Sequence, residues 1–379
     1  MSFRRKEILF WLILLIFILG SAESICFVAF KTFKKRFTFL NFKKYVTDGS
    51  YIKYASQKYH PERGWDNLYP TKFGERPRSI DYNESLISVF GDSNVHCDEV
   101  NHDETWEEYL SALLQKNVYN FGSGGYGADQ TYLKFLSIFP EARTPIVVLG
   151  FPMESINRIV SVYRPFYYEN TGLRLTKPRF FLKQDGGLSF LPNPVHSLDE
   201  VKNLNNPYFL NLIGRYDYWF NRDRYPTFMF PYTKILFNKR VWLEIVYGKG
   251  RSEIDDVNPR PSENLWKDTE TAELMFNILK SFAVRSKDLD AIPIIMIFPT
   301  ENEVKNKFSY GRGSIAEEKI SLFCQQNNIL LFNSVEVLAQ NASSVAEIKS
   351  FFKGHLSVKG NQAIARYFHD FLKNYVLEN

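Results

Sequence analysis

From residue 85 onward, short apolar runs alternate with longer segments whose apolar positions recur at helical spacing. The apolar runs predict strands at 86–90, 117–122, 145–151, 291–298 and 329–334. The spacing predicts helices at 104–115, 128–139, 271–286, 314–328 and 360–376. Because buried strands that alternate with helices are typical of a parallel sheet covered on both faces, the pattern predicts an α/β fold.

The alternation stops between about residues 160 and 270, where the chain is rich in aromatic residues. We interpret 160–270 as an insertion into a domain at 81–379, with a hairpin predicted at 179–191. Burial in a core of the insertion is the commoner role of aromatic side chains, and contact with sugar rings or lipid is the alternative. The residues concerned are Tyr216, Tyr218, Trp219, Phe220, Tyr225, Phe228, Phe230 and Tyr232.

Residues 8–30 form an apolar segment that follows Arg4-Arg5-Lys6. Its length is enough to cross a bilayer core of about 30 Å, but Gly20-Ser21-Ala22 also resembles a signal-sequence cleavage site. The return of apolar residues at Ile25 favours an anchor at 1–30 that stays attached. Both interpretations export the rest of the chain to the periplasm or cell surface, with 31–80 as a juxtamembrane lead-in.

The basic residues of the chain concentrate around this apolar segment. The net charge is +5, and residues 1–44 carry nine Lys and Arg against two Glu, so the remaining chain is slightly acidic. A nucleic-acid-binding protein would carry its positive charge on the folded body, so the distribution indicates a membrane rather than nucleic acid. Because basic residues lie on both sides of the segment, they do not fix its orientation.

Polar residues suited to catalysis follow the predicted strands. Gly91-Asp92-Ser93 follows the first strand, and ligands of open parallel sheets bind beyond the carboxyl ends of strands. A serine at such a turn can expose its hydroxyl, but it needs a base to become a nucleophile. Among six histidines, His355 lies in a loop that leads into the closing helix. Ser93 as a helix N-cap and His355 as a solvated loop residue are the alternatives.

These motifs resemble the SGNH/GDSL hydrolase family, in particular its membrane-anchored, exported bacterial branch. The resemblance is carried by "FGDS", "NFGSGGYG", a third strand that ends in glycine, and "GHLSVKGN", and it covers about residues 60–160 and 290–379. It implies a flavodoxin-like three-layer sandwich that cleaves or transfers acyl groups without a metal or other cofactor. It also implies that Ser93 is the nucleophile, that the N–H groups of Ser93 and Gly125 form an oxyanion hole, and that His355 is the base. Asp92 has a supporting role in shaping the turn.

The chain departs from the family pattern at two positions. Pro152 stands where the family has an asparagine, so we take Asn157, the nearest amide, as the candidate third oxyanion donor, with the hydroxyl of Ser155 as the alternative. Phe352 stands where the family has the aspartate that orients the histidine. A backbone carbonyl, Glu347 or another distant carboxylate must then orient His355.

The sequence thus predicts an exported serine esterase that acts on acyl esters, in particular acetyl esters of cell-surface glycans. An O-acyltransferase of extracellular polysaccharide with the same site is one alternative, and a non-catalytic surface binding protein is another. The polar loop at 96–103 contains His and Cys, but no second Cys/His pair has zinc-ligand spacing, so we expect a rim of the site and no metal. Three cysteines do not form a disulfide framework, although a Cys97–Cys324 bridge stays open.

Overall fold

The computed structural model describes residues 2–33, 49–67, 69–168, 171–223, 230–237 and 262–377. Its centre is a five-stranded parallel sheet formed by β3 (Ser85–Gly91), β4 (Asn117–Gly122), β5 (Ile146–Pro152), β8 (Ile292–Phe298) and β9 (Leu330–Asn333). The order across the sheet is β4-β3-β5-β8-β9. Because the chain moves from β3 to one side and then to the other, this is the flavodoxin-like order, with its switch point between β3 and β5. The predicted α/β sandwich is confirmed.

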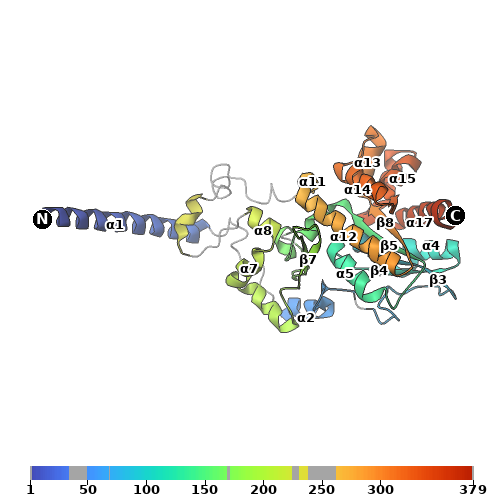
Figure 1. Cartoon of the computed structure of the whole chain (residues 1–379), viewed down its shortest axis with the longest axis horizontal. Helices are drawn as coiled ribbons and strands as arrows, with labels where there is room; N and C mark the ends of the chain where they lie inside the picture. The colour runs from blue at the N-terminus through green and yellow to red at the C-terminus, as the bar shows by residue number, and fades with distance from the viewer. Residues whose placement is uncertain are drawn as a thin grey trace.

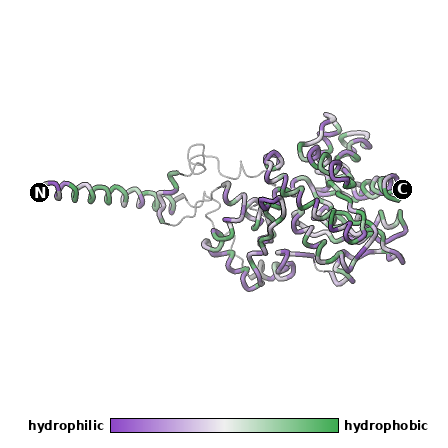
Figure 2. The backbone as a smooth tube through the Cα atoms, in the orientation of Figure 1, coloured by the Kyte–Doolittle hydropathy of each residue, from purple (hydrophilic) through white to green (hydrophobic). Residues whose placement is uncertain are grey.

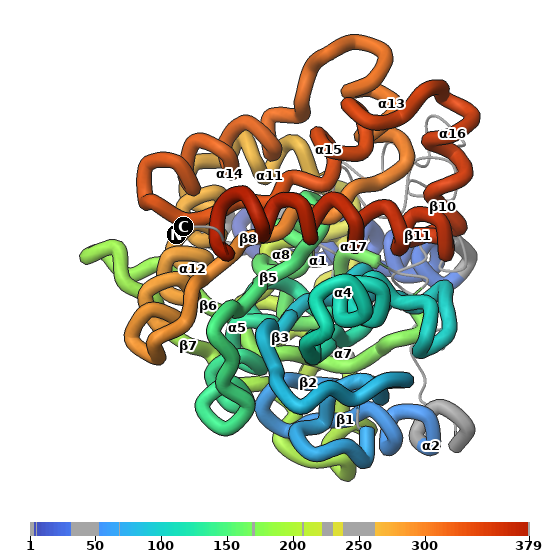
Figure 3. Tube along the Cα trace, turned by 90° about the vertical axis from the view of Figure 1, so that its right-hand side faces the viewer, coloured from blue at the N-terminus to red at the C-terminus, as the bar shows by residue number. Residues whose placement is uncertain are grey.

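Helices cover both faces of the sheet (Figure 1). On one face lie α4 (Trp106–Leu114), α15 (Ser334–Asn341) and α17 (Val358–Leu372). On the other face lie α5 (Ala128–Ile138), α12 (Thr269–Asp288) and α14 (Ile315–Gln326). In Figure 3, α5 and α12 lie to one side of the sheet strands β3, β5 and β8, and α4 lies to the other side. Strand β5 is buried along its whole length, as expected of a central strand between two helical layers.

Helix α1 (Ser2–Phe33) extends away from the folded body (Figure 1) and is apolar along most of its length (Figure 2). By length and composition, its segment Lys6–Lys31 could cross a membrane, with a mean hydropathy of 2.4. The carboxylate of Glu23 accepts hydrogen bonds from the backbone N–H groups of Tyr232 and Thr233. The insertion therefore supplies partners for the acidic side chain in this apolar helix, through η7 (Tyr232–Phe237).

The insertion contains the hairpin expected from its sequence, formed by β6 (Arg179–Leu182) and β7 (Leu188–Leu191). Its other elements are η5 (Arg164–Phe166), η6 (Leu198–Asn205), α7 (Pro207–Gly214) and α8 (Tyr218–Asp223). Trp219 and Phe220 are buried, whereas Tyr216 and Phe230 are exposed. Tyr225 and Phe228 lie outside the described residues. The aromatic residues therefore include both core positions and surface positions.

The second half of the lead-in packs on the sandwich through a buried ionic network. It forms α2 (Gly49–Lys58) and a hairpin of β1 (Tyr59–His60) and β2 (Gly64–Trp65). Asp66 follows β2, and its carboxylate accepts hydrogen bonds from Arg63 at 2.7 Å and from Lys134 of α5 at 2.6 Å. Burial alone would raise the pKa of Asp66, but the charges of Lys134 and Arg63 hold it well below its usual range.

Replacing Asp66 should destabilise the whole body. In Asp66→Ala, Lys134 and Arg63 would stay buried without their carboxylate, a situation that costs about 3–5 kcal/mol. We expect the free energy of unfolding in urea to fall by about that amount. The exposed pair of Lys267 and Glu263 provides a control, because Glu263→Ala should change the same quantity little. Equal effects of the two substitutions would contradict the role of Asp66 as the partner of two buried cations.

Candidate active site

Three glycines at neighbouring strand ends make room for the short helix that carries Ser93. Gly91 of β3 lies in register with Gly122 of β4 and Gly150 of β5. A Cβ atom at Gly122 would lie 2.2 Å from the backbone nitrogen of His96, and one at Gly91 would lie 2.2 Å from the side chain of Val95. Helix α3 (Ser93–His96) can therefore sit directly on the strand ends. This position is the topological switch point of the sheet, where ligands of such folds bind.

Asp92 holds the N-terminal end of α3 in place. Its fully buried carboxylate accepts a hydrogen bond from the backbone N–H of Asn94 at 2.9 Å, which caps the helix. It also accepts one from Arg158 of α6 (Ile156–Ile159) at 2.7 Å. Arg158 also donates to the carboxylate of Glu154 at 2.8 Å. Asp92 thus holds the turn between β3 and α3. Part of this hold comes from Arg158, which was not identified from the sequence as a site residue.

Arg158 keeps its positive charge in this buried place. Burial alone would lower the pKa of Arg158, but the carboxylates of Asp92 and Glu154 raise it above its ordinary value. A fixed cation therefore lies beside the end of α3.

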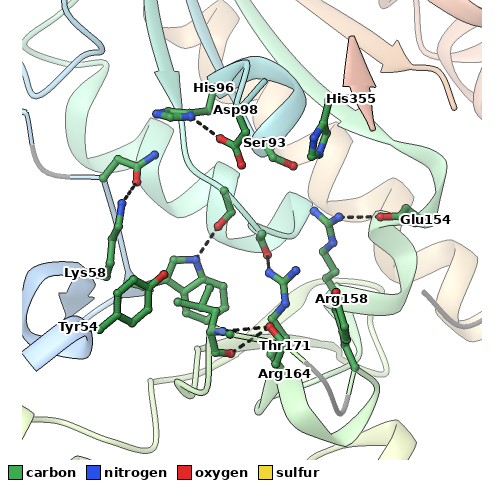
Figure 4. A pocket seen from close by; sticks show the side chains of 17 residues that line it. Tyr54, Lys58, Ser93, His96, Asp98, Glu154, Arg158, Arg164, Thr171 and His355 are labelled. Atoms are coloured by element: carbon green, nitrogen blue, oxygen red, sulfur yellow. Dashed lines mark hydrogen bonds and ion pairs between the residues drawn. The ribbon is translucent and has the colours of Figure 1, made fainter. Parts of the chain in front are cut away.

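Ser93 and His355 line one cavity of about 480 Å³. Figure 4 shows the Ser93 hydroxyl beside the His355 ring, with Arg158 on the same side of the cavity, and no hydrogen bond is drawn between the serine and the histidine. Ser93 is 6% exposed, so its hydroxyl is reached through the cavity rather than from open solvent. The remaining wall comes from the lead-in, α3 and the loop after it, the loop after β4 and the insertion. It includes Tyr54, Lys58, Trp65, Asn67, His96, Asp98, Gly124, Gly125, Arg164, Tyr168 and Thr171.

A carboxylate that the sequence reasoning missed faces His355. The histidine lies in β11 (His355–Leu356), which pairs with β10 (Phe352–Lys353) in a small hairpin. Its Nδ1 atom is 3.4 Å from Oε1 of Glu99, a residue of the loop that follows α3. If Nδ1 carries the proton toward Glu99, Nε2 is left as a proton acceptor.

The other candidates for orienting the histidine are engaged elsewhere. Glu347 accepts hydrogen bonds from Ser343 at 2.6 Å and from Lys359 at 3.2 Å. The position of the family aspartate is occupied by Phe352, whose backbone pairs with Leu356. Of the alternatives left open by the sequence, the structure thus places a distant carboxylate, that of Glu99, beside His355 in place of Glu347.

Asn361 ties the histidine hairpin to the rest of the site. Its amide donates to the carbonyls of Leu356 at 3.2 Å and Ser357 at 3.0 Å. Its side-chain oxygen accepts a hydrogen bond from the backbone N–H of Trp106, at the start of α4, at 3.0 Å. The asparagine of the "GHLSVKGN" motif thus links the segment of His355 to the helix that follows the Ser93 loop.

Ser93 and Gly125, the two residues expected to supply backbone oxyanion donors, line the cavity, whereas Asn157 does not. No described residue accepts a hydrogen bond from the backbone N–H of Ser93 or Gly125, and both residues line the cavity. Gly125 has a φ of +78°, and a Cβ atom there would collide with the guanidinium of Arg164. Asn157 is fully buried and lies outside the cavity wall, where its carbonyl accepts a hydrogen bond from Trp219. Its neighbour Arg158 reaches the cavity instead.

His96 also lines the cavity, but both of its ring nitrogens are engaged. Nε2 lies 2.6 Å from the hydroxyl of Tyr69, and Nδ1 contacts the carboxylate of Asp98. Burial alone would raise the pKa of Asp98, but the hydrogen bond from His96 lowers it below its usual value. His96 and Asp98 thus form a polar rim of the cavity. Among the described residues, no three or more His, Cys, Asp or Glu side chains form a group that could hold a metal ion.

Glu107 of α4 is completely buried behind the Ser93 loop. Its carboxylate faces the thiol of Cys97, which also contacts Asn361 at 3.2 Å. All three cysteines are free, so the Cys97–Cys324 bridge is not formed. Burial raises the pKa of Glu107 to about 8 from its ordinary 4.5, so the folded protein keeps this carboxyl protonated at neutral pH.

This burial should make stability fall as the pH rises. The unfolded chain loses the Glu107 proton near pH 4.5, whereas the folded chain loses it near pH 8. The contribution of protonated Glu107 to the free energy of unfolding is therefore fully present below pH 4.5 and is lost as the pH rises through 8. The loss is on the order of 5 kcal/mol, at about 1.4 kcal/mol for each pKa unit. Glu107→Gln should remove this part of the pH dependence in urea unfolding at pH 5 and pH 8.5. If Glu107→Gln had the same pH dependence of the free energy of unfolding as wild type, Glu107 would not be its source.

Among known proteins, similarity to this chain is found only at the level of solved structures. No family model matches the chain, and no curated protein matches it. A lipolytic protein of the G-D-S-L family from Desulfitobacterium hafniense has a similar structure, with 13% identity, a TM-score of 0.36, and coverage of 76% of this chain and 99% of its own. A G-D-S-L family protein from Veillonella parvula has 11% identity, a TM-score of 0.36 and coverage of 78% and 100%. A catalytic mutant of an acetylxylan esterase from Geobacillus stearothermophilus has 11% identity, a TM-score of 0.37 and coverage of 76% and 94%. Each of these three proteins shares a distant structural likeness and little sequence with this chain.

Proposed function

We propose that the chain is an SGNH-type serine hydrolase that cleaves acyl esters. The observation that carries this proposal is the arrangement of three side chains around one cavity. Ser93 and His355 line the cavity together, and Oε1 of Glu99 lies 3.4 Å from Nδ1 of His355. This is the order of nucleophile, base and orienting acid that activates a hydroxyl.

In the first half of the reaction, Oγ of Ser93 attacks the carbonyl carbon of the ester while Nε2 of His355 takes the hydroxyl proton. The N–H groups of Ser93 and Gly125 hold the oxygen that becomes negative, and the charge of Arg158 lies beside them. The intermediate then collapses, and the leaving alcohol takes the proton from His355. Glu99 stabilises the imidazolium that exists between these steps.

In the second half, His355 takes a proton from water, and the hydroxide attacks the acyl group on Ser93. Collapse releases the carboxylic acid and returns the proton to Oγ of Ser93. An alcohol that reaches the acyl-serine in place of water would turn the same site into an acyltransferase.

The proposed place of action is the outside of a membrane, on acetyl esters of surface glycans. The length and apolar composition of α1 support a membrane anchor, and the partners that η7 gives to Glu23 support a folded body close to the membrane surface.

A fluorophosphonate probe tests the proposed function, because it phosphonylates a serine that is activated by a neighbouring base. We expect full-length protein in detergent to be labelled at Ser93, as located by peptide mass spectrometry, and Ser93→Ala to remain unlabelled. His355→Gln should label much more slowly. Absence of label from Ser93 in folded wild-type protein would overturn the proposal and favour a binding protein.

A further inference from the structure

Two cationic side chains line the cavity on the side away from Ser93 and His355 (Figure 4). Lys58, at the end of α2, donates a hydrogen bond to the neutral amide oxygen of Asn67 at 2.6 Å. Arg164, in η5, donates to the carbonyl oxygen of Gly125 at 3.1 Å. Neither cation forms an ion pair with an acidic side chain in the part of the chain that the structure describes.

The acidic groups on the cavity wall already have cationic or imidazole partners. Asp98 contacts His96, and Glu154 accepts a hydrogen bond from Arg158 at 2.8 Å. Lys58 and Arg164 therefore place positive charge on the far side of the cavity, and no carboxylate of the described wall forms an ion pair with either of them. A partly enclosed positive charge favours an anionic ligand group.

Aromatic rings lie among these cations. The indole N–H of Trp65 donates to the carbonyl of Gly124 at 3.0 Å, which fixes the ring in the wall. The guanidinium of Arg164 lies 5.4 Å from the centre of the Tyr168 ring, and Tyr54 also lines the cavity. Flat rings suit the apolar face of a sugar ring, and a guanidinium or ammonium suits a carboxylate on that sugar.

We propose that the alcohol part of the ester substrate is a sugar that carries a carboxylate. Lys58 and Arg164 bind the carboxylate, while the acyl ester lies at Ser93. This inference rests on the proposed ester hydrolysis and adds the substrate class. The two cations come from the lead-in and the insertion, so the segments outside the alternating α/β pattern determine the substrate, and the sandwich supplies the reaction.

The test compares acetylated oligogalacturonates with the same oligosaccharides after conversion of their carboxylates to neutral amides. Acetate release by full-length protein gives kcat/KM for each, and the ratio of the two is the preference for charge. We expect wild type to prefer the charged substrate by at least about tenfold, because a hydrogen bond to a charged group is stronger than one to a neutral group. Added salt should reduce the ratio.

Lys58→Gln and Arg164→Gln should each lower this ratio about tenfold, whereas Lys72→Gln, which removes a charge outside the cavity wall, should leave it unchanged. A wild-type ratio near one, with acetate release that still depends on Ser93, would overturn the inference and leave the proposed function standing. A preference that survives both substitutions would overturn it as well. If wild-type protein showed no Ser93-dependent acetate release, either from these substrates or from 4-nitrophenyl acetate, the proposed function would be overturned together with the inference.

Discussion

Ser93→Ala is expected to lower kcat/KM for 4-nitrophenyl acetate by about 10⁴-fold or more, because removal of a nucleophilic serine leaves only what the oxyanion donors and binding supply. The substitution removes one oxygen that donates to no described residue. The fold should therefore survive, and the unfolding midpoint should stay close to that of wild type. Initial rates of nitrophenolate release, corrected for hydrolysis in buffer, provide the measurement.

Ser350→Ala is a matched control, because Ser350 lies outside the cavity wall and donates to the carbonyl of Glu347. It should keep wild-type kcat/KM. Equal turnover by wild type and Ser93→Ala would show that another group cleaves the ester.

Glu99→Gln should have the second largest effect. The change keeps the shape of the side chain but removes the charge that stabilises the His355 imidazolium and selects its tautomer. The corresponding change of a triad aspartate to an amide costs about 10⁴-fold, and we expect a loss of about 10³-fold here because the contact of 3.4 Å is longer than usual. The loss should fall mainly on kcat, since Glu99 does not line the cavity.

Glu347→Gln separates the two carboxylates that could orient the histidine. Because Glu347 contacts Ser343 and Lys359 rather than His355, this variant should keep wild-type kcat. A larger loss in Glu347→Gln than in Glu99→Gln would contradict the structure of the site.

The sheet could be predicted from the sequence because central parallel strands are continuous apolar runs. Strand β4 has the predicted bounds of 117–122, and the others begin or end within one or two residues of the prediction. Helix α13 (Glu301–Tyr310) was missed because Val304 is its one buried residue, which leaves no apolar stripe.

The candidate site residues that lie in sequence motifs could be predicted. The residues whose place in the site depends on contacts between distant segments could not. Ser93 and His355 each lie in a short motif at the end of a strand or the start of a helix. Glu99 reaches His355 because the hairpin of β10 and β11 folds against the loop after α3, and no spacing in the sequence records that contact.

The choice between Asn157 and Arg158 also depends on the fold. Successive side chains of a helix point about 100° apart, so two neighbouring residues cannot both face the cavity in the same way. The amide chemistry of Asn157 fitted the family pattern, but α6 directs Asn157 into the interior and Arg158 toward Asp92 and the cavity. A cation therefore occupies the place where an amide was expected.

The central claim is that Ser93 and His355 work as one unit, and the kinetics of Ser93→Ala, His355→Ala and the double variant test it most directly. Residues that act on the same step are not additive, so the double variant should be no slower than the slower single variant. If the two losses multiplied instead, the hydroxyl and the imidazole would act independently, and the assignment of Ser93 and His355 as nucleophile and base of one reaction would be wrong.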